Sequence, residues 1–247
     1  MEGNVMEQNV IFKIHVFGQT IPITSTIITM WIVMAVMLLL AYIFTRKLKT
    51  IPEGKQNVAE LIVETINNTA KENIGHHWRD FAPYFGSIFI FLVAANMSPL
   101  FSIIPKGEQL YHITGLKFFE HWPNYSIIAP TTDLNVTATM GAMSIILVLF
   151  SSIRYKGVGG WLKGFAKPNP VMIPFNIMDY GTRFLSLSLR LFGNLLASFI
   201  VMELVISHVQ PLILAPVAGF FFDMFDACLQ AFIFVFLSAF YIREAIE

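Results

Sequence analysis

The sequence has little charge. Only 13% of its 247 residues are charged, about half of the roughly 25% that is typical of soluble domains. The formal net charge is +0, so the chain lacks the basic surface of a nucleic-acid-binding protein. The single cysteine, Cys228, excludes an internal disulfide and a cysteine metal cluster. The sequence also lacks a phosphate-binding loop of the GxxxxGK[ST] type, so we expect no nucleotide chemistry from this chain.

Apolar residues are abundant, and they occur in long runs. Hydrophobic residues make up 55% of the chain, including 24 Phe. A helix that crosses the hydrocarbon core of a bilayer needs about 20 mostly apolar residues. The pattern therefore predicts an all-α polytopic membrane protein with five membrane-spanning helices. Their predicted ranges are 26–45, 81–104, 134–153, 173–208 and 211–243.

The segments between the spans indicate the orientation. Residues 54–75 have apolar side chains at helical spacing and read as an amphipathic helix on the cytoplasmic surface. Residues 106–130 read as an external loop, and 157–165 as a short interfacial helix. Basic residues follow the first and third spans, so the positive-inside rule places those ends in the cytoplasm. We therefore predict an external N-terminus and a cytoplasmic C-terminus.

The last two predicted helices are longer than a bilayer requires. A continuous helix over 173–208 would be about 54 Å long at ~1.5 Å per residue. The hydrocarbon core is only about 30 Å thick, so such a helix must kink, protrude or tilt beyond the usual ~20°. The same reasoning applies to 211–243. These ranges predict a strongly tilted helical hairpin at the C-terminus.

A polar stripe runs along the first of these long helices. A central arginine such as Arg190 costs between about 2.5 and 17 kcal/mol in a bilayer, so it needs a partner or a hydrated cavity. Its neighbours at three- and four-residue steps share its helix face: Arg183, Ser186, Asn194 and Ser198. We predict that the two arginines, having no acid beside them, face an anionic partner from elsewhere. The alternative is that Arg190 pairs with a carboxylate of its own chain and is purely structural.

Three short motifs resemble those of one family, subunit a of the rotary ATP synthases. Residues 189–194 (Leu-Arg-Leu-Phe-Gly-Asn) are similar to its signature. Residues 133–137 (Asp-Leu-Asn-Val-Thr) resemble the entrance to its third span, and 229–234 (Leu-Gln-Ala-Phe-Ile-Phe) resemble its last helix. The motifs occur in the family's order, and the resemblance extends over roughly residues 75 to 243.

The resemblance implies a role for each polar residue. Arg190 would face the essential carboxylates of a neighbouring ring of c subunits, lower their pKa and favour ion release. Because an arginine has a pKa above about 12, it would also block direct leak between two offset half-channels. Asn194 and Gln230 match polar positions that line the route or hold Arg190, although either could simply bond across the helix pair. Arg183 and Ser186 would line the cytoplasmic half-channel or contact lipid.

Two positions depart from the common bacterial pattern of this family. Phe199 stands where many relatives have an acid, and Asp223 stands where many have a histidine. Glu203, one turn beyond Phe199, would replace the missing acid. We therefore predict that Glu203, Asp223 and Asp226 form the external half-channel, with Asp223, Asp226 and Gln230 on one stripe. Carboxylates serve protons and sodium ions alike, so the coupling ion stays open.

The implied protein is a non-catalytic, ion-translocating stator subunit in the plasma membrane of a bacterium. Its expected partners are the c-ring, the peripheral-stalk b subunits, the rest of the complex and membrane lipid, with no nucleic acid, cofactor or metal. The main alternative is a secondary transporter that binds an anionic substrate through Arg190. An intramembrane enzyme is less favoured because no catalytic motif lies at membrane depth, and the polar stripes argue against a simple anchor.

Overall fold

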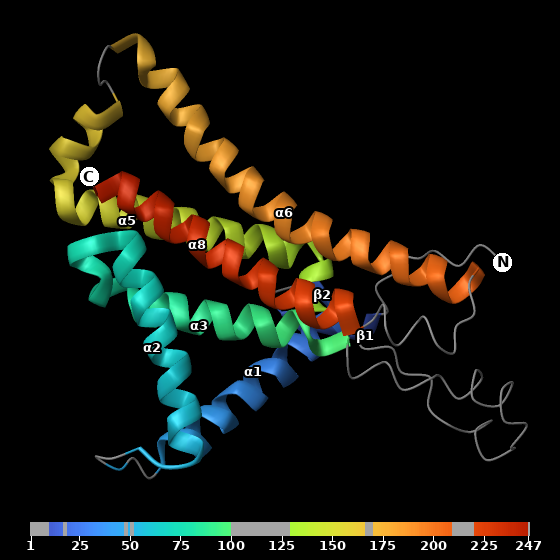
Figure 1. Ribbon diagram of the computed structural model, residues 1–247. Helices are drawn as coiled ribbons and strands as arrows, with labels where there is room; N and C mark the ends of the chain where they lie inside the picture. Colours follow the sequence, from blue (N-terminus) through green and yellow to red (C-terminus); the bar gives the residue numbers. More distant parts are fainter. Residues whose placement is uncertain are drawn as a thin grey trace, which may run out of the picture.

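Helices dominate the computed structural model, which describes residues 10–16, 19–46, 49, 52–99, 129–165, 170–208 and 220–246. Figure 1 shows most of them gathered in a bundle. The main elements are β1 (Val10–Val16), β2 (Gln19–Thr24), α1 (Ser25–Thr45), α2 (Lys55–Ile74), α3 (Trp78–Asn96), α5 (Leu134–Phe165), α6 (Ile173–His208), the π-helix η6 (Phe220–Asp226) and α8 (Ala227–Ile246). Short 3-10 turns occur at Gly75–His77, Pro130–Thr132 and Pro170–Met172.

Three helices in the described ranges are long and apolar enough to cross a membrane. They lie at Ser25–Thr45, Leu134–Phe165 and Met224–Ile246. Helices α3 and α6 are not in this group, which is defined by length and apolar composition. In α6, the charged and polar stripe lowers the hydropathy. An all-α membrane fold is therefore supported, while the count of five spans stays a prediction.

A β-hairpin precedes α1, and the prediction of a purely helical fold missed it. β1 and β2 pair antiparallel, with Ile14 opposite Ile21 and Val16 opposite Gln19. The signal was present in the sequence, because apolar and polar residues alternate from Phe12 to Val16 and alternation is the pattern of a strand. The hairpin contacts the start of α1 through β2.

Helix α3 ends at Asn96, and residues 100–104 at the end of the predicted second span lie outside the described residues. Two polar contacts hold this end in place. Thr131 Oγ1 donates a hydrogen bond to Asn96 Oδ1 at 2.5 Å, and Ser98 Oγ donates to the carbonyl of Ala95 at 2.8 Å. Most of the predicted external loop, 106–130, lies outside the described residues.

Helix α5 has a sharp bend at Gly157. Its φ of 71° and ψ of 161° are not helical, and a positive φ is readily adopted only by glycine. The bend separates the long apolar part of α5 from a short last segment. It falls at the start of the range 157–165, for which the sequence predicts a separate interfacial helix.

Small residues allow α5 to approach its neighbours closely, as they do in many membrane bundles. A side chain on Gly141 would clash with Ser188 Oγ of α6 and would lie 3.4 Å from the carbonyl oxygen of Phe184. On α5, Ser144 Oγ donates a hydrogen bond to Ser238 Oγ of α8 at 2.8 Å. The close approach of Gly141 to Ser188 positions α6 two residues before Arg190.

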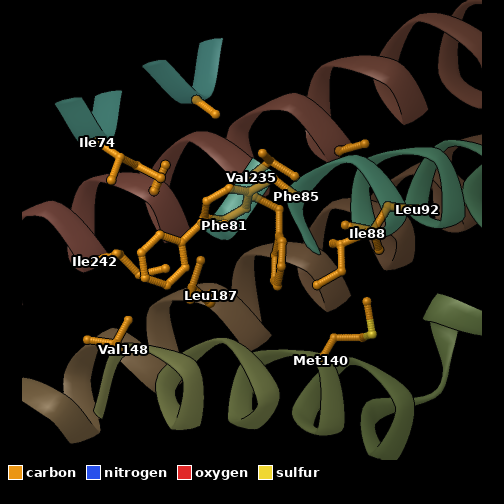
Figure 2. Close-up of a cluster of buried hydrophobic side chains, with 14 of the residues drawn as sticks. Ile74, Phe81, Phe85, Ile88, Leu92, Met140, Val148, Leu187, Val235 and Ile242 are labelled. Atoms are coloured by element: carbon orange, nitrogen blue, oxygen red, sulfur yellow. The ribbon is translucent and has the colours of Figure 1, made fainter. Parts of the chain in front are cut away.

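One apolar core joins α2, α3, α5, α6 and α8. Figure 2 shows Phe81 and Phe85 of α3 at its centre, between Leu187 of α6 and Val235 of α8. The 36 residues of α6 extend beyond this core, and Figure 1 shows the first turns of α6 diverging from the part of α5 that precedes Gly157.

Candidate functional site

Arg190 lies at the border between the buried and exposed faces of α6. Leu187 and Leu191 are fully buried in the core, whereas Leu189 is 55% exposed. Gly193, one turn after Arg190, is exposed, and a side chain there would meet no neighbouring atom. The Arg190 side chain itself is exposed. Arg190 therefore lies on a face of α6 that no described residue covers.

Arg190 has no acidic partner within the described part of the chain. No carboxylate there lies within 4.0 Å of its guanidinium group, and no hydrogen bond joins it to another described residue. The alternative interpretation, in which Arg190 pairs with a carboxylate of its own chain, is thus not supported by any ion pair among these residues.

Arg183 is in the opposite situation. Its Nη2 atom forms ion pairs with Asp179 at 2.5 Å and with Glu244 of α8 at 2.7 Å. The guanidinium group also lies 4.8 Å from the ring centroid of Tyr241, a favourable cation–π arrangement. The prediction that neither arginine has an acid beside it was therefore wrong for Arg183, which connects α6 to the end of α8.

A second polar contact between α6 and the C-terminal helix centres on Asp226. Asn194 Nδ2 donates a hydrogen bond to Asp226 Oδ2 at 2.5 Å, and Ser198 Oγ donates to the same oxygen at 3.4 Å. An ionised carboxylate suits this role because it only accepts hydrogen bonds. Asn194 thus bonds across the helix pair, one turn beyond Arg190.

Two buried polar groups of α6 and α8 have no hydrogen-bond partner among the described residues. Gln230 of α8 is only 3% exposed and its Nε2 atom is unpaired, as is the Oγ atom of buried Ser188. Such groups are rare in folded proteins. Ser186, the remaining member of the stripe, is half-buried.

The family model described as ATP synthase A chain matches residues 27–243. The chain belongs to this family. An ATP synthase A chain is an ion-translocating subunit of the membrane sector, F0, and it works in a complex with other subunits. The catalytic nucleotide chemistry of the synthase is not the task of this subunit.

For an A chain, the acids predicted to form the external route are of particular interest. Glu203 lies on α6, and Asp223 lies in the π-helix η6; the side chains of both, and that of Phe199, are outside the described part. The placement of Asp223, Asp226 and Gln230 on one stripe stays a prediction. Asp226 is the acid of this group that is seen to contact α6.

Sequence reasoning missed two residues of the A chain that shape the site. Asp179 precedes Arg183 by four residues, a spacing that places the two side chains on one helix face. The pair could therefore have been predicted. Glu244 lies far away in sequence, so nothing local indicated that it would reach Arg183.

Proposed function

We propose that Arg190 is the fixed positive charge past which the carboxylates of a ring of c subunits move. One observation supports this most strongly: of two arginines on one helix face, Arg183 is neutralised by two acids of its own chain and Arg190 by none that is described. An unpaired arginine in a bilayer carries a large free-energy cost. An acidic group on a neighbouring rotor would remove that cost.

The chemistry of this arrangement is electrostatic. A nearby guanidinium group stabilises the ionised form of a ring carboxylate, so it lowers the pKa of that carboxylate and promotes release of the bound ion. The arginine keeps its own proton and therefore passes none across. Ions would enter and leave through half-channels on either side of Arg190, and each charge that crosses at 100 mV supplies about 2.3 kcal/mol for rotation.

The external half-channel in this proposal includes Glu203, Asp223, Asp226, Asn194 and Gln230. The contact between Asn194 and Asp226 supports it, because it places a carboxylate and an amide within one turn of Arg190 along α6. The unpaired polar atom of Gln230 supports it too, since water in a hydrated route would satisfy that atom. Ser186 and the region of Arg183 would belong to the cytoplasmic side.

The location and partners follow from the same proposal. The subunit would lie in a bacterial plasma membrane with its N-terminus outside and its C-terminus in the cytoplasm. Besides the c-ring, the b subunits of the peripheral stalk would contact its outer helices. The carboxylates named above serve either protons or sodium ions, so the chain leaves both ions open.

Substitution of Arg190 tests the proposal. In intact synthase reconstituted into vesicles, Arg190→Ala should abolish ATP synthesis driven by an ion gradient, because the ring carboxylates lose their counter-charge. The matched control is Lys163→Ala, which removes an exposed cation away from the stripe and should leave synthesis unchanged. Normal coupled synthesis in the Arg190→Ala variant would refute the proposal.

A further inference from the structure

A pocket of about 200 Å³ lies at one end of the helix bundle. The end of α5 on both sides of the Gly157 bend, the first turns of α6 and the end of α8 line it. Its aromatic wall consists of Trp161, Phe165 and Tyr180. The ring centroids of Trp161 and Phe165 are 5.0 Å apart, and those of Phe165 and Tyr180 are 5.6 Å apart. No residue of the proposed ion route lines this pocket except Arg183.

The pocket also has charges of both signs. Lys156 and Arg183 supply two positive charges, and Asp179 and Glu244 supply two negative ones. Arg183 is bound to both carboxylates, but these remain 49% and 51% exposed, so each keeps oxygen lone pairs for another donor. Lys156 is exposed and forms no ion pair with any residue in the described ranges.

The pocket lies where the apolar spans end. Arg154, Lys156 and Lys163 follow the apolar part of α5, and Arg243 and Glu244 follow that of α8. In a membrane protein this is the level of the lipid headgroups, where aromatic side chains are also enriched. A ligand of the pocket would therefore come from the bilayer surface.

We propose that this pocket binds the headgroup of a zwitterionic phospholipid with a primary ammonium group, as in phosphatidylethanolamine. The lipid phosphate would bind the ammonium group of Lys156, and the lipid ammonium group would bind the half-exposed oxygens of Asp179 and Glu244. The balanced charge of the pocket favours this class. An anionic headgroup such as phosphatidylglycerol would meet two carboxylates, and the quaternary ammonium of phosphatidylcholine has no N–H to donate to them. The inference does not depend on the role proposed for Arg190.

Lipid add-back to the intact complex tests the inference. The purified synthase would be delipidated in detergent and titrated with phosphatidylethanolamine, phosphatidylglycerol or phosphatidylcholine of the same acyl chains, with bound lipid counted by native mass spectrometry. Phosphatidylethanolamine should bind best. Lys156→Ala should weaken its binding about tenfold, the scale of one lost hydrogen bond to a charged group. Lys163→Ala, an exposed cation that does not line the pocket, should change nothing.

A second variant examines the ammonium side of the site. Asp179→Asn removes one carboxylate while Arg183 keeps its ion pair with Glu244. The preference for phosphatidylethanolamine over phosphatidylglycerol should fall, and assembly of the variant into the complex would show that it is folded. The inference is overturned if the wild type binds the three lipids equally, if phosphatidylglycerol binds best, or if Lys156→Ala retains full binding.

Discussion

At the scale of single residues, ion pairing separates the two arginines of α6. Arg183 has two carboxylates of its own chain and an aromatic ring around it. Arg190, two turns further along, is exposed and has no acidic neighbour among the described residues. A fully paired cation suits a connection between helices, whereas an unpaired one at the edge of an open face suits a charge that acts on another molecule.

Substitution of Asp226 tests the proposed ion route at the scale of one residue. Asp226→Asn keeps the shape of the side chain but removes the charge that accepts from Asn194 and Ser198. We expect ion flux from the external side to fall several-fold, because the route loses a fixed acceptor. Flux would be measured in vesicles that contain the reconstituted membrane sector. Glu64→Gln, which neutralises an exposed acid on α2, is the control, and equal flux in both variants would remove Asp226 from the route.

At the scale of helices, the close contact of α5 and α6 positions Arg190. Gly141 of α5 faces Ser188 of α6 without room for a side chain between them. Because Ser188 precedes Arg190 by two residues, any separation of the two helices would move the arginine as well. The small residue at position 141 therefore serves the geometry of the site as well as packing.

A double-mutant cycle tests this contact. Gly141→Ala should destabilise the packing of α5 on α6 by about 1–3 kcal/mol, the usual range for overpacking. Ser188→Ala should restore much of that stability in the double variant, since it removes the clashing oxygen. Gly159→Ala, where a side chain would meet nothing within 4 Å, is the control. The change would be read from the thermal stability of the assembled complex, and purely additive effects of the two substitutions would contradict a direct clash.

The sequence predicted elements whose signal is local. Helix α6 occupies the predicted range 173–208, and α1 begins one residue before its predicted start. The contact at the end of α3 could not be predicted in this way, because it is a hydrogen bond from Thr131, which is distant in sequence from Asn96. The π-helix η6 also left no periodic signal in its run of phenylalanines. Within the site, Arg190 and Asn194 were predicted from the polar stripe, but the contacts of Asn194 with Asp226 and of Arg183 with Glu244 depend on tertiary packing.

At the scale of the whole molecule, apolar side chains face outward on several helices. α1 is almost entirely unburied, and Leu38 on it is 72% exposed. On α6, Leu185, Leu189 and Ile200 form an exposed apolar row. In Figure 1, α1 and α6 leave the bundle on opposite sides. The molecule thus presents two separate apolar surfaces, of which the proposal assigns the α6 surface to the c-ring.

Disulfide cross-linking in the assembled synthase tests that assignment most directly. Cys228, the only cysteine, would be replaced by serine. One new cysteine would then be placed at Leu189, beside Arg190, or at Leu38 on α1, and another on the c subunit one turn from its essential carboxylate. We predict that the cysteine at position 189 cross-links to the c subunit under mild oxidation and that the cysteine at position 38 does not. Cross-linking from position 38 but not from position 189 would contradict the claim that Arg190 faces the ring.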